Sequence, residues 1–75
     1  MGYQVMAVKL SRREYEVLMR AAWSDADTAN QLNLAPTTVR NYWVALFRKL
    51  QANNKAMAAI KAMRLGLISI YHFII

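Results

Sequence analysis

The chain has no cysteine and only one histidine, His72, among its 75 residues. Without cysteine it can form neither a disulfide bond nor a thiolate metal site. A single histidine in an apolar segment supplies no ligand set for a metal ion. The four carboxylates lie near expected helix starts, where they act as caps, and no nucleophile can be paired with a general base. We therefore expect no metal, no cofactor and no enzymatic activity.

Long apolar runs are also missing. The longest, residues 65–75, spans 11 positions, whereas a transmembrane helix needs about 20. Residues 1–9 lack the basic and apolar regions of a signal peptide, and they are expected to form an N-terminal arm. These absences predict a cytoplasmic protein with no membrane partner.

Negative charge is absent from residue 28 onward. The four acidic residues all precede this point, together with four basic residues that balance them. The six basic residues that follow are Arg40, Arg48, Lys49, Lys55, Lys61 and Arg64. A segment with one sign of charge suits a polyanion, because neutralising phosphates releases counterions. A solvated basic face would give the same pattern, so the charge alone leaves both interpretations open.

The hydrophobic content of 57% is high for so short a soluble chain. A domain of this size is close to the lower limit for a self-sufficient core, and no disulfide bond or metal can stabilise it. Helix packing must therefore supply the stability, and we expect association with a second chain to add to it.

Local signals predict an all-α fold of four helices. Ser11 and Glu14 fit a capping box, and Ser24 precedes an acidic first turn. Pro36 suits the first turn of a helix, and Asn54 suits a cap. The helices expected from these starts cover residues 12–22, 25–32, 36–50 and 55–65.

Apolar spacing predicts which sides of the second and third expected helices are buried. Residues Ala26, Ala29 and Leu32 mark the inner face of the short helix. The turn at 33–35 joins it to the longer helix, with Leu34 as the apolar residue between them. The buried line of the longer helix is expected to be Val39, Trp43, Leu46 and Leu50.

A short helix, a three-residue turn and a second helix with a polar outer face form a helix-turn-helix arrangement. In this arrangement the early residues of the second helix face base edges in the major groove. The planar fork of Arg40 matches guanine, and the amide of Asn41 matches adenine. The residues expected to contact bases are Thr37, Arg40, Asn41 and Val44. Those expected to contact the DNA backbone are Arg12, Arg13, Thr38, Tyr42, Arg48, Lys49 and Lys55.

These segments resemble the LuxR/GerE-type helix-turn-helix DNA-binding domain. The matching motifs are LSRREYEVL at 10–18, TVRN at 38–41, RKL at 48–50 and RLGLI at 64–68. The resemblance covers residues 10–68, and its nearest form is the stand-alone, GerE-like type. It implies a four-helix domain whose third helix enters the major groove and whose fourth helix commonly pairs two domains on a dyad-symmetric site. In this chain Thr28 stands where the family buries an isoleucine.

The fourth expected helix carries apolar residues on two sides, which favours a dimer contact. The residues expected at this dimer or partner interface are Met57, Ile60, Lys61, Met63, Arg64, Ile68, Tyr71 and Phe73. Gly66 is expected to end the helix. The hydrophobic tail at 69–75 could extend the helix, pack back on the domain or pair with a second copy, and the sequence does not choose between these.

Two functions are compatible with this pattern. The first is a sequence-specific regulator of transcription that binds double-stranded DNA as a small homodimer. The second is a protein-interaction module of the same fold that binds another transcription regulator or RNA polymerase. A heterodimer with a larger regulator would combine the two. The apolar excess, the two tryptophans and the apolar Val44 on the outer face favour the second.

Overall fold

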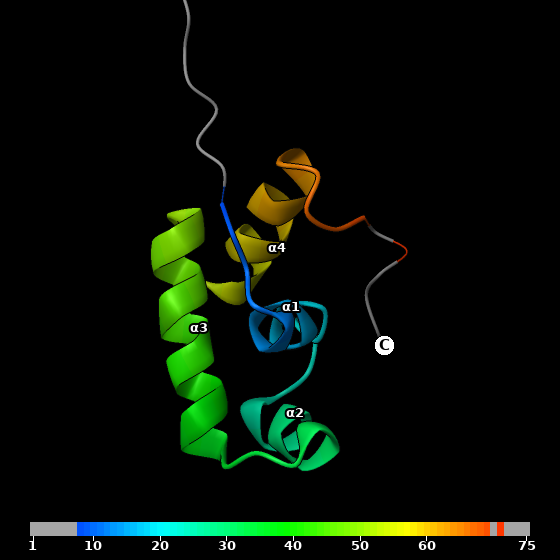
Figure 1. Ribbon diagram of the computed structural model, residues 1–75, viewed down its shortest axis with the longest axis vertical. Coiled ribbons are helices and arrows are strands. Elements are labelled where there is room, and N and C mark those ends of the chain that lie inside the picture. The colour runs from blue at the N-terminus through cyan, green and yellow to red at the C-terminus, as the bar shows by residue number, and fades with distance from the viewer. Residues whose placement is uncertain (1–7, 70, 72–75) are drawn as a thin grey trace, which may run out of the picture.

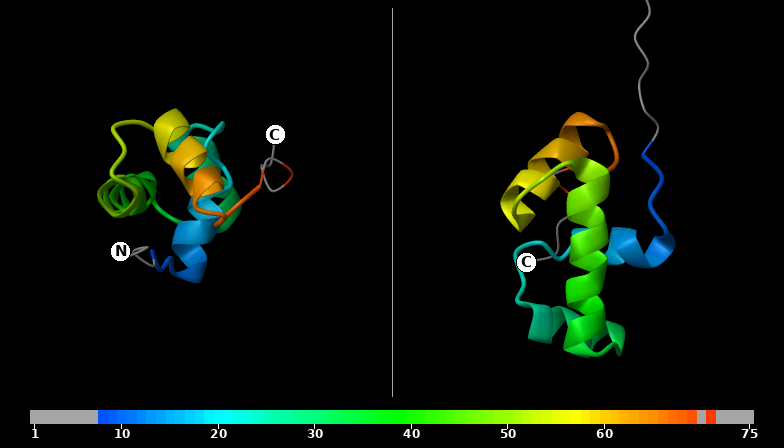
Figure 2. Two further views of the ribbon diagram at one scale, coloured as in Figure 1. Left: turned by 90° about the horizontal axis from the view of Figure 1, so that it is seen from above. Right: turned by 90° about the vertical axis from the view of Figure 1, so that its left-hand side faces the viewer.

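Four helices make up the domain in the computed structural model, which describes residues 8–69 and 71 (Figure 1). They are α1 (Arg12–Leu18), α2 (Asp25–Leu32), α3 (Pro36–Leu50) and α4 (Lys55–Arg64). The described residues contain no strand. The longest helix, α3, stands along one side of the molecule in Figure 1 and faces the viewer in the right panel of Figure 2, and the other three helices pack against it. The predicted all-α fold is confirmed.

Side-chain caps fix the starts of three helices. At α1 the Ser11 hydroxyl accepts a hydrogen bond from the Glu14 amide at 3.1 Å, and the Glu14 carboxylate accepts one from the Ser11 amide at 2.8 Å. Ser24 and Asn54 each accept from the amide three residues further on, at 3.0 and 2.8 Å. The remaining helix, α3, has no side-chain cap and begins at Pro36, which has no amide hydrogen to satisfy.

The ends of α2, α3 and α4 share one geometry. Each helix is followed by a residue with positive φ: Asn33 at 58°, Gln51 at 54° and Gly66 at 75°. The next amide in each case donates to the carbonyl five residues earlier at 2.9 Å, which is the Schellman motif. The carbonyl of Gln51 also accepts a hydrogen bond from the ammonium of Lys61 at 2.6 Å. These ends turn the chain sharply, and the predicted role of Gly66 is confirmed.

Helix α1 is shorter than the sequence predicts. It ends at Leu18, so the expected continuation to residue 22 is wrong. The amides of Arg20 and Trp23 donate to carbonyls only three residues back, those of Val17 and Arg20. Such bonds belong to tighter turns than an α-helix. The chain therefore winds in single turns from α1 to the start of α2.

The core lies where α1, α2 and α4 meet α3. The expected buried line of α3 is confirmed, since Val39, Trp43, Leu46 and Leu50 are all at most 3% exposed. On α2 the expectation for Ala26 is wrong, because its side chain is exposed and that of Thr28 is completely buried instead. On so short a helix, Ala29 and Leu32 can share a buried face with either Ala26 or Thr28. In the structure they share it with Thr28.

The segment directly before the hydrophobic tail packs on the domain. Ile68 is only 4% exposed and belongs to the core. The hydroxyl of Tyr15, on α1, donates to the carbonyl of Leu67 at 2.9 Å. Residues 67 and 68 therefore pack on the domain directly before the tail at 69–75. Position 70 and positions 72–75 lie outside the described residues, as do positions 1–7 of the expected N-terminal arm.

Candidate nucleic-acid interface

One side of α3 presents a continuous strip of exposed side chains, here called the outer strip. Its members are Thr37, Arg40, Asn41, Val44 and Arg48, and all five are exposed. They are the residues that the helical spacing predicts to face outward. Within residues 8–69 and 71, neither Arg40 nor Arg48 forms an ion pair or a side-chain hydrogen bond. Their guanidinium groups are therefore available to an outside acceptor.

The turn between α2 and α3 determines where the outer strip lies. Asn33 adopts the left-handed conformation, and the following amide, that of Leu34, donates to the carbonyl of Ala29. Leu34 is half-buried and packs against the core. This fixes the start of α3 against α2, and the exposed side of its first turns faces solvent.

The inner side of α3 is held by aromatic packing. The rings of Trp43 and Phe47 lie 5.6 Å apart between centroids, and Trp43 is only 2% exposed. The ammonium of Lys55 lies 5.2 Å from the centre of the Trp43 ring, which is within the range of a cation–π contact. With its inner side fixed in this way, α3 can present the outer strip as a rigid surface.

Lys49 was expected at the DNA backbone, and the structure places its ammonium against α1. It donates to the carboxylate of Glu14 at 2.7 Å and to the carbonyl of Lys9 at 3.0 Å. Burial by itself would raise the pKa of Glu14, but the hydrogen bonds from Lys49 and from the Ser11 amide outweigh it and lower this pKa below its ordinary 4.5. Glu14 is therefore ionised at neutral pH and offsets the charge of Lys49.

Lys55, also expected at the DNA backbone, joins three parts of the domain. Its ammonium donates to the Asp25 carboxylate at 2.8 Å and to the Trp23 carbonyl at 3.1 Å. These contacts tie the start of α4 to the start of α2, directly above the ring of Trp43. The sequence did not reveal either lysine's partner because Glu14 and Asp25 lie 35 and 30 residues earlier and already serve as cap or first-turn residues.

The other residues expected at the backbone lie on the surface around the outer strip or at the start of α1. Thr38 and Tyr42 are half-buried on α3. Arg12 and Arg13 lie 4.0 and 3.1 Å from the carboxylate of Glu16. Ion pairs this exposed contribute little to stability, so the two arginines can exchange Glu16 for a phosphate at small cost.

The expected interface on α4 is only partly exposed. Ile60 is 50% exposed and Tyr71 is 93% exposed. Arg64 is also exposed, and three further residues are half-buried: Met57, Lys61 and Met63. Ile68 lies in the core of its own chain, so it is unavailable to a partner, and Phe73 lies outside the described residues. Leu65, which the sequence reasoning did not single out, is 48% exposed.

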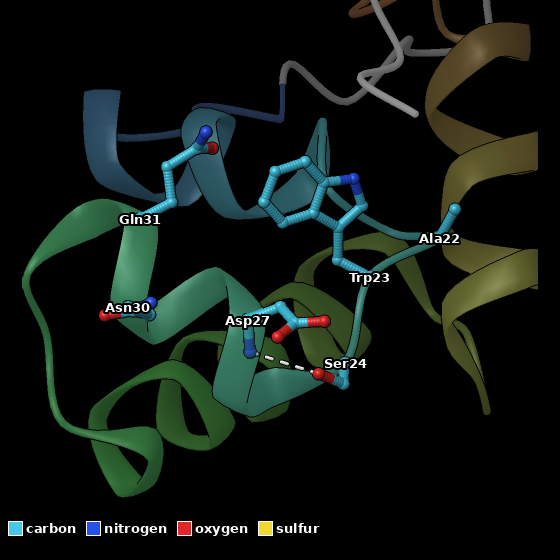
Figure 3. Close-up of a pocket in the computed structure, with 6 residues that line it drawn as sticks. All are labelled: Ala22, Trp23, Ser24, Asp27, Asn30 and Gln31. Carbon is cyan, nitrogen blue, oxygen red and sulfur yellow. Dashed lines mark hydrogen bonds between the residues drawn. The ribbon is translucent and has the colours of Figure 1, made fainter.

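A shallow hollow of about 540 Å³ lies beside the turn between α1 and α2 (Figure 3). Its lining residues are Ala22, Trp23, Ser24, Asp27, Asn30 and Gln31. Only one of them, Asp27, carries a charge, and none belongs to the outer strip. The hollow therefore adds nothing to a surface that would contact phosphates.

A known protein family matches the part of the chain that contains α2, the turn and α3. The family model of bacterial regulatory proteins of the luxR family, GerE, matches residues 8–62, which is more than half of the chain. The chain belongs to the luxR family. No curated protein and no solved structure matches it significantly. The luxR-family helix-turn-helix domain indicates a DNA-binding transcription regulator rather than an enzyme. No helix in the described part is long and apolar enough to cross a membrane.

Proposed function

We propose that this luxR-family domain binds double-stranded DNA sequence-specifically, with the outer strip of α3 in the major groove. The observation that carries this proposal is the pair of exposed arginines, Arg40 and Arg48, neither with a partner in the described residues, on the helix that follows the tight turn. These arginines break no ion pair or side-chain hydrogen bond within the described residues when they contact DNA. Basic side chains that are paired within the domain would first have to leave their acidic partners.

Base reading is assigned to the first half of the outer strip. The guanidinium of Arg40 can donate to both guanine acceptors in the major groove, and the amide of Asn41 can pair with adenine in the same two-bond manner. Thr37 precedes Arg40 by about one turn and Val44 follows it by about one turn. All four therefore face a short run of neighbouring base pairs.

Phosphate contacts are assigned to residues at the edges of this surface. Arg48 lies at the far end of the outer strip, and Thr38 and Tyr42 flank it on α3. Arg12 and Arg13, at the start of α1, are the other basic residues assigned to phosphates. Lys49 and Lys55 are left out of this proposal because their ammonium groups already have acidic partners within the domain.

We further infer a homodimer through α4. Ile60 is half exposed on this helix, beside Arg64 and the half-buried Met57 and Met63. A large apolar side chain at that level of exposure gains from being covered by a second copy. Two copies related by a dyad would present two α3 helices to two half-sites.

Removal of the Arg40 side chain tests this function. Arg40→Ala is expected to weaken binding to a preferred duplex by about 1–3 kcal/mol and to relax specificity at one base pair. The matched control is Arg48→Ala, which removes the same charge from the same helix. It is expected to weaken all duplexes alike and to reduce the dependence of affinity on salt. Mobility-shift titrations in which neither variant alters duplex binding would defeat the proposal.

A second function is favoured by the exposed apolar residues. Val44, Ile60 and Tyr71 are at least 50% exposed, which suits contact with another transcription regulator or with RNA polymerase. A larger regulator paired through α4 in a heterodimer would use the same surface. Under this alternative, purified protein would form a stoichiometric complex with such a partner and show no salt-dependent binding to duplex DNA.

A further inference from the structure

We propose that Val44 reads the C5-methyl group of a thymine, about two base pairs from the guanine read by Arg40. The inference rests on the proposed function and specifies its sequence preference. It concerns the one position of the outer strip where the side chain can neither donate nor accept a hydrogen bond.

The exposure of Val44 is unusual for its location. Four large hydrophobic side chains are exposed in the described part of the chain, namely Val44, Ile60, Leu65 and Tyr71. Of these, only Val44 lies on α3, where it is 50% exposed. Its neighbours one turn before and one turn after are the exposed Arg40 and Arg48. An apolar side chain is thus enclosed by two cations on the surface proposed to meet DNA.

The chemistry of the major groove leaves one partner for this side chain. Val44 cannot bind a phosphate, and it cannot replace the water on a base donor or acceptor. The only apolar group on the base edges in that groove is the methyl of thymine. Contact with this methyl removes two apolar surfaces from water at once.

The backbone of α3 sets the distance from Val44 to Arg40. Four residues of an α-helix rise about 6 Å, and successive base pairs are about 3.4 Å apart. Where α3 follows the groove, the two side chains therefore meet base pairs about two steps apart.

The orientation of Val44 is also fixed. Its neighbours Trp43 and Leu46 are buried at 2% and 0% exposure, so α3 cannot rotate about its axis without opening the core. Valine has one strongly preferred χ1 rotamer in a helix. The two methyl groups of Val44 are therefore held in place before DNA arrives.

Replacement of thymine by deoxyuridine tests the inference, because it removes the methyl group and leaves every hydrogen-bonding group unchanged. The probe is a duplex selected from a random-sequence pool by the protein itself. Each thymine of the half-site is replaced in turn, and the dissociation constant is measured by fluorescence anisotropy at fixed salt. One replacement is expected to weaken binding about fourfold, the effect of withdrawing one buried methyl-sized group.

Two variants assign that effect to its side chain. In Val44→Ala, replacing that thymine by deoxyuridine is expected to leave the dissociation constant almost unchanged. The matched control is Leu65→Ala, which trims an apolar residue of similar exposure away from α3 and is expected to keep the fourfold penalty. The sensitive thymine should lie about two base pairs from the position at which Arg40→Ala relaxes specificity.

The possible results distinguish a failure of the Val44 contact from a failure of the proposed DNA-binding function. Duplex binding that is unaffected by every deoxyuridine replacement overturns the reading by Val44 and leaves the proposed function standing. A fourfold deoxyuridine penalty that persists in Val44→Ala likewise overturns the reading by Val44 and leaves the proposed function standing. Failure to bind any duplex defeats the proposed function and this inference together.

Discussion

Thr28→Val is expected to stabilise the domain, although it alters a completely buried residue. The Thr28 side chain is 0% exposed, and its hydroxyl oxygen has no hydrogen-bond partner. A buried polar group left unpaired costs about 1–3 kcal/mol, since water solvates it in the unfolded chain. Valine replaces the hydroxyl by a methyl group of similar shape, and burial of that methyl contributes about 0.8 kcal/mol. Because the two effects act in the same direction, we expect the free energy of unfolding to rise by about 2–4 kcal/mol.

The assay is thermal and urea unfolding, followed by circular dichroism at one fixed protein concentration. For a domain of this size 1 kcal/mol shifts Tm by roughly 4–8 °C, so the gain should be at least about 8 °C. Thr37→Val is the control, because Thr37 is exposed and the same substitution there should change stability by less than about 0.5 kcal/mol. Destabilisation by Thr28→Val would refute the reasoning, since it would mean that the hydroxyl is satisfied in the folded protein.

Three further predictions concern the stability of the fold at Glu14, Gly66 and Lys55. The free energy of unfolding should fall as the pH is lowered below about 4.5. The pKa of Glu14 is lowered in the folded protein, so the unfolded chain binds the proton first. In urea titrations at a series of pH values, Glu14→Gln should make the free energy of unfolding less dependent on pH in this range. Gly66→Ala should lower the free energy of unfolding by about 1–2 kcal/mol in the same titrations. An added Cβ would meet nothing within 4 Å, but the φ of +75° strains the backbone of a residue with a side chain. An unchanged urea midpoint would contradict this. Lys55→Met should lower the free energy of unfolding by about 1 kcal/mol, because it leaves the carboxylate of Asp25 without the ammonium at 2.8 Å. A double-mutant cycle with Asp25→Asn should show that the effects of the two substitutions are coupled.

The starts of the helices could be predicted from the sequence because they depend on neighbouring residues. A serine or asparagine three positions before the amide it accepts from, or a proline in the first turn, is visible without any tertiary information. The same holds for the exposed side of α3, since Val39 and Trp43 define the buried side by their spacing alone. The expected turn at 33–35 was found for the same reason.

Long-range contacts could not be predicted in this way. The end of α1 at Leu18 depends on how the turn to α2 packs, and the hydropathy of residues 19–22 gave no sign of it. The partners of Lys49 and Lys55 come from other helices, so two basic residues that suited phosphates in the sequence turned out to hold the domain together. Thr28 is buried because of the rotation of α2, although alanine is the more apolar residue type.

The most direct test of the outer strip is an NMR titration of isotope-labelled protein with a duplex selected by the protein. We expect the largest shifts in the side-chain signals of Arg40 and Asn41 and in the methyl signals of Val44. The residues around the hollow, such as Asp27 and Asn30, should change little. Shifts concentrated at the hollow or on α4, with the signals of the outer strip unchanged, would contradict the claim that α3 reads DNA.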